Sequence, residues 1–372
     1  MIHYCFITGL YPRYDGLMYW RQGKSLVEEG FKVTYIVCDS LPNEVKDGIN
    51  IISTHFIPQG RRDRLYKTKR VLLSYVKQIN ADIYQISDPE LMGMVDELKK
   101  MNKKVIFNLR EYYPDLIVSA KPYLPKIIRK PLSLLVDKYQ GRVLKKYDAV
   151  FTITDWILKI LHDNYKINES YLLTNYPRIE KDFHLSYEDY LSRDNRLCYE
   201  GTIYRVSRQE KVFDALSQIE DISYLLAGKI EERYEWIKDH PYWPKVEFID
   251  GFKQSDLPAI FGRSTISNVF RDFEGREGST GVMKVFESME QGLPVLFADV
   301  PVYREINDKY HCGLCVDPNS SESIRDAIVY LMQNKKEAYD MGQRGRRAVE
   351  YEYNWDIQAK TYINVIKRLA SS

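Results

Sequence analysis

Short apolar segments alternate with amphipathic segments along nearly the whole chain, and this alternation limits the possible folds more than any other feature. Examples of the apolar segments are IHYCFITGL, KVTYIVC, ADIYQIS and KVIFNL, and stretches with helical periodicity separate most of them. Continuous apolar strands separated by helices are typical of a parallel sheet whose two faces are both covered. The sequence therefore predicts an α/β fold built from doubly wound, Rossmann-like parallel sheets.

The alternation is interrupted once, by the polar segment IEKDFHLSYEDYLSRDN at residues 179–195, and then restarts. This predicts an N-terminal Rossmann-like domain over 1–178, a connector over 179–195 and a C-terminal Rossmann-like domain over 196–354. We expect a final helix, 355–372, to pack back on the first domain. Ligands of such sheets bind outside the carboxyl ends of the strands, so we expect both domains to face a central cleft.

Composition and charge narrow the class of protein. The 372 residues can form two full cores, and the net charge is only +2, which argues against nucleic acid as a partner. The charge is divided unevenly, because residues 1–180 hold 28 Lys and Arg against 20 Asp and Glu. No apolar run reaches about 18 residues, and the N-terminus is typical of a first strand rather than a signal peptide, so we expect a cytoplasmic protein.

Five cysteines are scattered along the chain, and Cys312 and Cys315 form a C-x-x-C pattern. The pattern lies in CGLCVDP, which is typical of a strand that ends in a turn, and no second pair of ligands accompanies it. We therefore predict no metal site and no resident cofactor.

The sequence lacks the motifs of several common enzyme classes. In TGLYPRYDG, which follows the first strand, Gly9 and Gly16 do not form the G-x-G-x-x-G pattern of dinucleotide sites. The chain also has no Walker G-x-x-x-x-G-K-S/T loop, no H-E-x-x-H and no serine nucleophile elbow. These absences argue against an NAD-dependent dehydrogenase. The chemistry that the remaining motifs indicate is the binding of an anion in the second domain.

The segment STGVMKVFESMEQGLPV, residues 279–295, predicts a helix with an anion-binding start. The amides that begin such a helix can face an anion, and the residues concerned are Ser279, Thr280, Gly281 and Val282. Lys284 adds a positive charge, and Glu287 can accept hydrogen bonds from two hydroxyls. A phosphate at the helix start with a diol beyond it matches a nucleoside diphosphate. A solvated helix face with a weak ion pair would give the same pattern.

Several segments, taken in their order and spacing, resemble the GT-B glycosyltransferases. They are DPELMGMVDELKKMNKKVIFNLREYYPD, AVFTITDWI, LLTNYPR, CYEGTI, LLAGK, VEFIDGF, KVFESMEQGLPVLFADVPVYREI and CGLCVDP. The resemblance covers essentially the whole chain and is closest to family-4-like enzymes of bacterial surface polysaccharide synthesis. It implies a hexosyltransferase-type enzyme that moves a sugar from a nucleotide-diphosphate sugar to a glycan or lipid-linked glycan acceptor. It also implies retention, with neither a metal nor a covalent intermediate.

The resemblance implies roles for residues of the second domain. Glu287 resembles the second Glu of the family's E-x7-E motif, which binds the ribose hydroxyls of the donor. The first Glu of that motif would fall at Ser279, which is a departure, and Glu277 is an alternative. Lys284 resembles the Lys that contacts the donor diphosphate in a subgroup with K-x-x-E. Because the family's Arg after the strand would fall at a threonine, the candidate phosphate ligands there are Arg205 and Arg208.

In the first domain, NLREYYPD resembles the D-x-H-E stretch of related enzymes. Arg110 stands at the His position and Glu111 is retained, so both are candidate catalytic residues. Asp88 ends the preceding predicted strand and is a third candidate, although it could instead be a helix cap before proline. Gly16 belongs to the loop that would close beneath the donor phosphates. Should the product be inverted, a base is needed, and Glu111 or Asp88 would supply it.

Two basic stretches of the first domain, GRRDRLYKTKR and KPYLPKIIRKPLSLLVDKYQGRVLKK, mix cations with apolar residues. They suit an anionic bilayer that carries a lipid-linked acceptor, which would place the protein peripherally on the inner face of the membrane. Solvated helices with apolar core faces explain them equally well. Two other functions stay open: a sugar-nucleotide 2-epimerase on a similar fold, and a non-catalytic nucleotide- or glycan-binding subunit. The sequence leaves the donor base, the sugar, the acceptor, the linkage and the oligomeric state undetermined.

Overall fold

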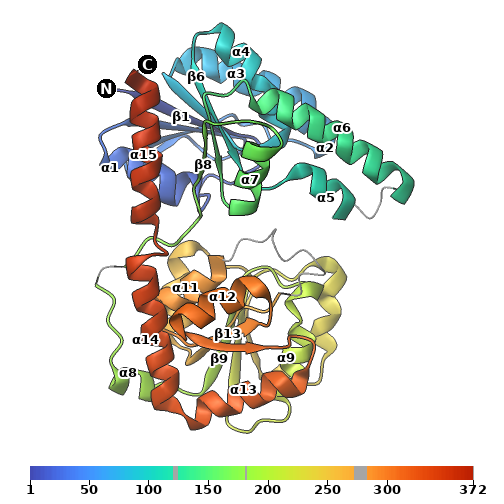
Figure 1. Cartoon of the computed structure of the whole chain (residues 1–372), viewed down its shortest axis with the longest axis vertical. Helices are drawn as coiled ribbons and strands as arrows, with labels where there is room; N and C mark the ends of the chain where they lie inside the picture. The colour runs from blue at the N-terminus through green and yellow to red at the C-terminus, as the bar shows by residue number, and fades with distance from the viewer. Residues whose placement is uncertain (120–124, 181, 272–282, 372) are drawn as a thin grey trace. The chain divides into compact units, whose positions relative to one another are not determined.

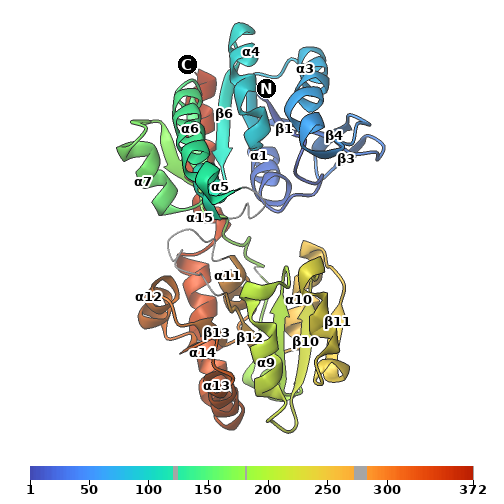
Figure 2. The ribbon, with the colours of Figure 1, turned by 90° about the vertical axis from the view of Figure 1, so that its right-hand side faces the viewer.

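The computed structural model describes residues 1–119, 125–180, 182–271 and 283–371. These residues fall into two compact units (Figure 1). The first unit spans Met1–Asn175 together with the chain from Ile357 onward, and the second spans Tyr176–Asp356. Each unit is a mainly parallel sheet with helices on both faces (Figure 2). The predicted Rossmann-like α/β fold is therefore confirmed for both halves of the chain.

The sheet of the first unit has eight strands in the order β3-β4-β2-β1-β5-β6-β7-β8. Neighbouring strands are parallel except β3 and β4, which pair antiparallel. The strand order reverses between β1 and β5, because the chain builds outward from β1 and then returns to its other side. The strands are β1 (His3–Thr8), β2 (Lys32–Val37), β3 (Glu44–Lys46), β4 (Ile49–Ser53), β5 (Ile83–Ile86), β6 (Lys104–Leu109), β7 (Ala149–Thr152) and β8 (Ser170–Leu172).

Amphipathic helices cover this sheet, and α7 (Asp155–Asp163) shows why such segments are helical. Thr154 caps its first turn by accepting a hydrogen bond from the Ile157 amide at 3.4 Å, and Ile157 and Leu161 face the core. The other helical segments are η1 (Met18–Gly23), α1 (Lys24–Glu28), α2 (Gly60–Arg62), η2 (Asp63–Lys67), α3 (Thr68–Ile79), η3 (Pro89–Met94), α4 (Val95–Lys100), α5 (Tyr113–Ser119) and α6 (Lys126–Leu144).

Helix α15 (Trp355–Ser371) belongs to the first unit from Ile357 onward. The buried Tyr362 hydroxyl lies 3.0 Å from the Tyr4 hydroxyl and 3.2 Å from Oε1 of Gln85. The Tyr362 ring packs edge-on against Phe151, with 5.2 Å between ring centres. Because these partners come from β1, β5 and β7, the helix crosses one face of the sheet (Figure 1).

The sheet of the second unit has six parallel strands in the order β11-β10-β9-β12-β13-β14. Here the strand order reverses between β9 and β12. The strands are β9 (Arg196–Glu200), β10 (Ser223–Ala227), β11 (Val246–Ile249), β12 (Ile266–Asn268), β13 (Val295–Ala298) and β14 (Gly313–Val316). In the C-x-x-C pattern, Cys312 directly precedes β14 and Cys315 lies on it, and both are free thiols.

Helices pack on both faces of this sheet as well. They are α8 (Tyr187–Leu191), η4 (Arg205–Ser207), α9 (Gln209–Leu216), η5 (Glu232–Asp239), η6 (Trp243–Lys245), η7 (Gln254–Asp256), α10 (Leu257–Gly262), α11 (Met283–Glu290), α12 (Pro301–Tyr310), α13 (Ser321–Gln333) and α14 (Lys335–Tyr351). The pattern after Ser320 predicts a pair of helices, whereas the structure has three. The break between α13 and α14 falls at Asn334, whose Nδ2 donates to the Tyr330 carbonyl at 2.8 Å.

The segment predicted as a connector, 179–195, is counted with the second unit. Leu185 and Tyr190 are buried in its core, and the Tyr190 hydroxyl donates to the Thr265 carbonyl at 3.0 Å. The sequence pattern hides this role because only isolated side chains of the segment face inward. Within the described ranges, no helix is long and apolar enough to cross a membrane.

Candidate functional site

The carboxyl ends of β9 and β12 lie where the strand order of the second unit reverses, and open α/β sheets bind ligands at such points. Strand β9 ends at Tyr199 and Glu200, and α11 is the next described helix after β12. The predicted pair, Lys284 and Glu287, lies on α11. The structure therefore brings these two residues to the end of the sheet where a ligand is expected.

The polar face of α11 is covered by protein. The i, i+3, i+4, i+7 spacing of Val282, Val285, Phe286 and Met289 predicts one apolar stripe on this helix. Val282 lies outside the described residues, and the other three are buried. Glu287, which lies off this stripe, is only 6% exposed. The Lys284 ammonium donates to the Tyr199 hydroxyl at 2.9 Å and lies 4.3 Å from the centre of that ring. A solvated face with a weak ion pair does not fit this burial.

Two glycines allow the Lys284 ammonium to lie directly against the main chain. A Cβ added at Gly201, whose φ is +114°, would lie 2.1 Å from Lys284 Nζ. A Cβ added at Gly228 would lie 1.8 Å from the Gly201 carbonyl oxygen. Glycine is therefore required at both positions, and the ammonium is held at the carboxyl end of β9.

Glu200, the last residue of β9, and Glu287 on α11 are both buried, and the two carboxyl groups are close enough for Glu287 to affect the ionisation of Glu200. Burial raises the pKa of Glu200 to about 8, against the lowering effect of Lys284 and with a further contribution from Glu287. Burial by itself lowers the pKa of Lys284, but Tyr199 and Glu200 outweigh it and hold that pKa above its ordinary value. Burial therefore favours the protonated form of Glu200, whereas Tyr199 and Glu200 favour the charged form of Lys284.

The candidate phosphate ligands after β9 lie on and beside the short turn η4. Arg205 is exposed, and Arg208 is half-buried with its Nη1 3.9 Å from Oε1 of Glu210. Arg208 also has a left-handed backbone, with φ +50°, at the start of α9. The remaining candidates of this unit lie outside the described residues, and they are Glu277, Ser279, Thr280, Gly281 and Val282.

In the first unit, Asp88 fastens the loop that follows β1. Its carboxylate accepts hydrogen bonds from the Gly9 amide at 2.7 Å and from the Thr8 hydroxyl at 2.8 Å. Asp88 occupies the position before Pro89 that a helix cap would take, but its side chain makes no capping hydrogen bond. Burial raises the pKa of Asp88 to about 7, although the Gly9 and Thr8 hydrogen bonds lower it. Asp88 therefore acts on the loop and not on the helix.

Arg110 fastens the same loop from the other side. Its guanidinium donates to both carboxylate oxygens of Asp15, at 2.6 and 3.0 Å, and stacks 3.9 Å from the centre of the Tyr11 ring. Asp15 also accepts hydrogen bonds from the amides that begin η1. The neighbouring Glu111 is exposed, and the Gly16 carbonyl accepts a hydrogen bond from Arg21 at 2.8 Å.

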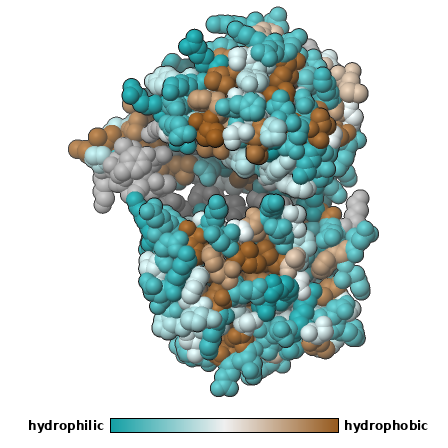
Figure 3. Space-filling view, turned by 180° about the vertical axis from the view of Figure 1, so that it is seen from behind, coloured by the Kyte–Doolittle hydropathy of each residue, from teal (hydrophilic) through white to brown (hydrophobic). Residues whose placement is uncertain are grey.

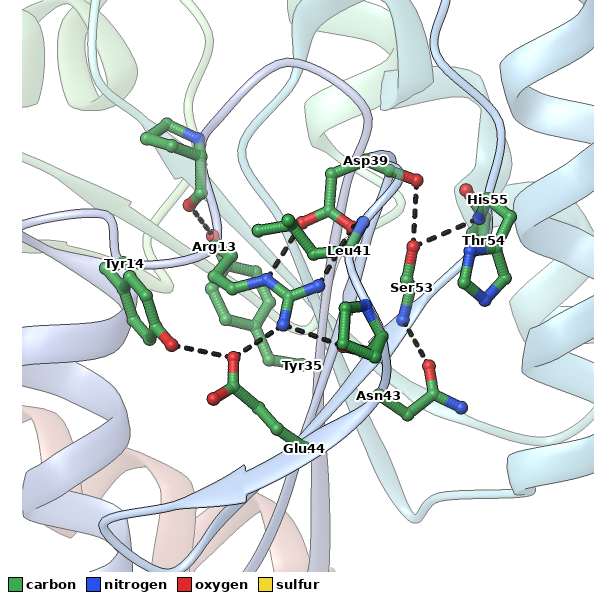
Figure 4. Close-up of polar contacts among 12 residues, drawn as sticks. Arg13, Tyr14, Tyr35, Asp39, Leu41, Asn43, Glu44, Ser53, Thr54 and His55 are labelled. Carbon is green, nitrogen blue, oxygen red and sulfur yellow. Dashed lines mark hydrogen bonds and ion pairs between the residues drawn. The ribbon is translucent and has the colours of Figure 1, made fainter.

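A third attachment joins this loop to the loop after β2, as Figure 4 shows. Arg13 is only 5% exposed, and its guanidinium donates to both oxygens of Asp39 at 2.9 Å. It also donates to Oε1 of Glu44 at 2.5 Å, and Tyr14 donates to the same oxygen at 2.6 Å. The loop at the switch point of the first unit is thus held by three charged attachments: Asp88, Arg110, and Asp39 together with Glu44.

Sequence reasoning missed several residues of both clusters. Tyr199 and Glu200 had a usable signal, because they precede a glycine at the end of a predicted strand in CYEGTI. Arg13 and Asp15 had none, because their partners are distant in sequence. Within the described part of the chain, no group of three His, Cys, Asp or Glu side chains could hold a metal ion. The second unit instead offers a cation beside hydrogen-bond acceptors, which can bind an anion attached to a diol.

Two family models match the chain, one in each half. The model described as Glycosyltransferase Family 4 matches residues 19–174, and the model described as Glycosyl transferases group 1 matches residues 189–348. The chain is a glycosyltransferase. No curated protein sequence matches it.

Several solved structures have the fold of this glycosyltransferase. Sucrose-phosphate synthase from Thermosynechococcus elongatus is 16% identical, with a TM-score of 0.75 and 100% of both chains covered. HepE from Anabaena, solved in complex with UDP-glucose, is 11% identical, with a TM-score of 0.66 and 100% of both chains covered. WaaG, a glycosyltransferase involved in lipopolysaccharide biosynthesis, is 13% identical, with a TM-score of 0.66 over 98% of this chain and 99% of the other. The glycosyltransferase therefore has the GT-B fold.

Proposed function

We propose that the glycosyltransferase takes its sugar from a nucleoside-diphosphate sugar bound in the second unit and transfers it to a glycan or lipid-linked glycan. One observation carries this proposal: Lys284 and the buried Glu287 lie together at the carboxyl end of β9. The ammonium suits the diphosphate, and Glu287 suits the ribose hydroxyls, because a carboxylate accepts two hydrogen bonds. HepE, which shares the fold, is solved with a donor of this class, UDP-glucose.

In the proposed reaction, the bond between C1 of the sugar and the diphosphate oxygen breaks, and C1 bonds to an acceptor hydroxyl oxygen. The diphosphate leaves with the electron pair and takes up the acceptor proton. Lys284 stabilises the negative charge that grows on the diphosphate, which is electrostatic stabilisation of the transition state. Arg205, Arg208 and the amides of residues 279–282 are proposed as further phosphate ligands. We propose retention at C1, without a metal or a covalent intermediate.

The first unit is proposed to supply the acceptor side. Asp88 and Arg110 hold the loop after β1, because their side chains are already engaged by that loop. Glu111 is exposed and is therefore the carboxylate proposed to face substrate. For an inverted product, Glu111 would be the base.

The outward face of α6 supports a lipid-linked acceptor at the inner face of a bacterial membrane. Its N-terminal half exposes apolar side chains, with Ile127 84%, Leu134 63% and Leu135 66% exposed. Figure 3 shows apolar side chains at this end of the helix. Its C-terminal half carries the exposed cations Lys138 and Arg142, and the exposed Lys145 follows at the C-cap.

The cationic half of α6 also borders a groove of about 490 Å³. The residues that line it are Asp137, Lys138, Gly141, Arg142, Lys145, Asn164 and Tyr165. Apolar residues at one end of a helix and cations at the other suit the interface of an anionic bilayer, where the former enter the acyl region and the latter meet phosphates. We propose that this face places the enzyme beside a lipid-linked acceptor for surface polysaccharide or glycolipid synthesis.

Substitution of Lys284 tests the proposed donor site. Lys284→Met should weaken binding of the preferred nucleoside diphosphate, chosen among UDP, GDP and ADP, by about tenfold or more, because a charge-assisted contact is lost. It should change the affinity for the corresponding nucleoside much less. The matched control is Lys245→Met, which removes an exposed ammonium of the same unit. Equal losses for the nucleoside and its diphosphate would contradict the assignment of Lys284.

Product analysis separates the proposed activity from the alternatives. Mass spectrometry of reactions with UDP-, GDP- and ADP-sugars should show transfer to an added acceptor or slow hydrolysis of one donor. Conversion of the donor into an isomer without acceptor would indicate a 2-epimerase. Tight nucleotide binding with an unchanged donor, even with lipid-linked glycans present, would indicate a non-catalytic subunit.

A further inference from the structure

Gln209 is the first residue of α9 and has no exposed surface, although glutamine usually lies at the surface of a protein. Both ends of its side-chain amide are engaged. Its Oε1 accepts a hydrogen bond from the Tyr224 hydroxyl at 2.5 Å, and its Nε2 donates to the Ser207 carbonyl at 3.0 Å. Gln209 therefore joins β10 to the turn η4, and the candidate phosphate ligands Arg205 and Arg208 lie on and beside this turn.

The Tyr224 hydroxyl that Gln209 contacts is anchored in the sheet. Tyr224 lies on β10 with no exposed surface, and its hydroxyl accepts a hydrogen bond at 3.1 Å from Nδ2 of Asn268, the last residue of β12. The same Nδ2 donates to the Cys198 carbonyl of β9 at 3.2 Å. Hydrogen bonds that link buried polar groups in this way make their surroundings rigid. Three neighbouring strands thus hold the Tyr224 hydroxyl, and through it Gln209, in one place.

The other contact of Gln209 fixes the peptide group that leads into Arg208. Arg208 has a φ of +50°, in the left-handed region that residues other than glycine rarely adopt. The Ser207 carbonyl that Gln209 binds belongs to the peptide group directly before this φ. The Ser207 hydroxyl in turn donates to the Tyr204 carbonyl at 2.7 Å, which closes the turn. An unusual backbone conformation persists only where its surroundings hold it, and here Ser207 and Gln209 hold it from both sides.

A second set of contacts orients the side chain of Arg208. Its Nη1 lies 3.9 Å from Oε1 of Glu210. The hydroxyl of the buried Tyr234, on η5, donates to Oε2 of Glu210 and accepts a hydrogen bond from the Glu210 amide at 3.2 Å. Glu210 is therefore held beside the guanidinium. Because of this, the fixed backbone of Arg208 also determines where its positive charge lies.

We propose that Gln209 is a positioning residue for the donor diphosphate and acts through the turn that carries Arg205 and Arg208. The inference rests on the proposed function, because it takes these two arginines as phosphate ligands. Without the hydrogen bond from Gln209, the peptide group between Ser207 and Arg208 can rotate, and Arg208 can leave the left-handed region. The diphosphate then has to order the turn as it binds, and this ordering lowers its affinity.

The test compares the affinities for the preferred nucleoside diphosphate, chosen among UDP, GDP and ADP, and for its nucleoside, by calorimetry on the full chain. Gln209→Leu removes both hydrogen bonds and keeps a side chain of similar size. It should weaken diphosphate binding by about threefold to tenfold and change nucleoside binding by less than about twofold. Tyr224→Phe, which removes only the hydroxyl that holds Gln209, should give a smaller loss of the same kind. The matched control is Tyr190→Phe, because the Tyr190 hydroxyl is also buried but donates to the Thr265 carbonyl, directly before β12. It should leave both affinities unchanged.

A double-mutant cycle shows whether Gln209 acts through the arginines. In a protein with Arg205→Met and Arg208→Met, which should already bind the diphosphate weakly, the addition of Gln209→Leu should cost little more. Additive losses would overturn the proposal, and so would wild-type diphosphate affinity in Gln209→Leu. If Gln209→Leu does not fold, Tyr224→Phe takes its place in both comparisons. Wild-type affinity in the protein without the two arginines would refute their assignment as phosphate ligands, and the inference would fail with it.

Discussion

At the scale of single residues, carboxylates organise the ligand-binding ends of both sheets. Asp88 in the first unit accepts a hydrogen bond from the Gly9 amide, and Glu200 in the second lies near Lys284 and Glu287. Both acids are buried at a switch point in the strand order, and burial raises the pKa of each. The polar groups at these switch points are therefore held in place by contacts within the protein itself.

Asp88 should make the first unit less stable as pH rises. Its pKa in the folded protein is raised from 3.8 to about 7, so folding favours the protonated form. The resulting stability is fully present below the ordinary pKa and is lost as pH rises through the folded value, a change on the order of 4 kcal/mol. Asp88→Asn cannot titrate and should flatten this decline.

Urea denaturation at several pH values between about 4.5 and 8.5, followed by pulse-labelling mass spectrometry, measures this effect. Peptides from β1 and β5 report the first unit, and peptides from β9 and β10 serve as the internal control. Equal pH dependence of the first unit in wild type and Asp88→Asn would show that another group is responsible.

The sequence identified Asp88 and Glu287 as candidate site residues, but it missed Glu200 and could not show the contacts that Asp88 makes. The spacing of Val285, Phe286 and Met289 predicted the buried stripe of α11, because that pattern is local. The contact between Arg110 and Asp15 spans 95 residues, and that between Asp88 and Gly9 spans 79. No local pattern reveals such partners, so the fastening of the loop after β1 emerged only from the structure.

At the scale of elements, α11 and α6 both depart from the burial that their sequence patterns predict, and they do so in opposite directions. The polar face of α11 is covered at the end of β9, and its ion-pair pattern marks a buried cluster. The apolar residues at the start of α6 are exposed, although apolar helix residues usually form a core. In both helices, the residues whose burial differs from what the sequence pattern predicts are the ones that indicate a function.

Lipid binding by α6 can be measured by cosedimentation of the full chain with vesicles. Wild type should bind vesicles of phosphatidylglycerol and phosphatidylcholine more tightly than pure phosphatidylcholine. Leu134→Glu with Leu135→Glu should weaken binding by about tenfold or more, because burial of two leucines is lost. The control, Tyr351→Glu, changes an 80% exposed residue of the second unit. If the α6 variant kept its nucleotide affinity and bound vesicles as tightly as wild type does, this face of α6 would not be the membrane-binding surface.

At the scale of the whole molecule, the alternation of apolar strands and helices predicted both Rossmann-like units correctly. This succeeds because each strand buried on both faces needs a continuous apolar run, which is visible in any sequence. The pattern could not show that residues 182–195 contribute Leu185 and Tyr190 to the second core. It also could not show which polar residues meet at the strand ends, because local periodicity does not determine the order of the strands in a sheet.

The central claim is that Glu287 binds the donor nucleotide in the second unit. Calorimetry with UDP, GDP and ADP on wild type, Glu287→Gln and Glu290→Gln tests it most directly. For the preferred nucleotide, Glu287→Gln should weaken binding by about tenfold or more, because a charged acceptor of hydroxyl hydrogen bonds is lost. Glu290→Gln, one turn away and also buried, should bind nearly as wild type does. Wild-type affinity in a correctly folded Glu287→Gln protein would contradict the claim.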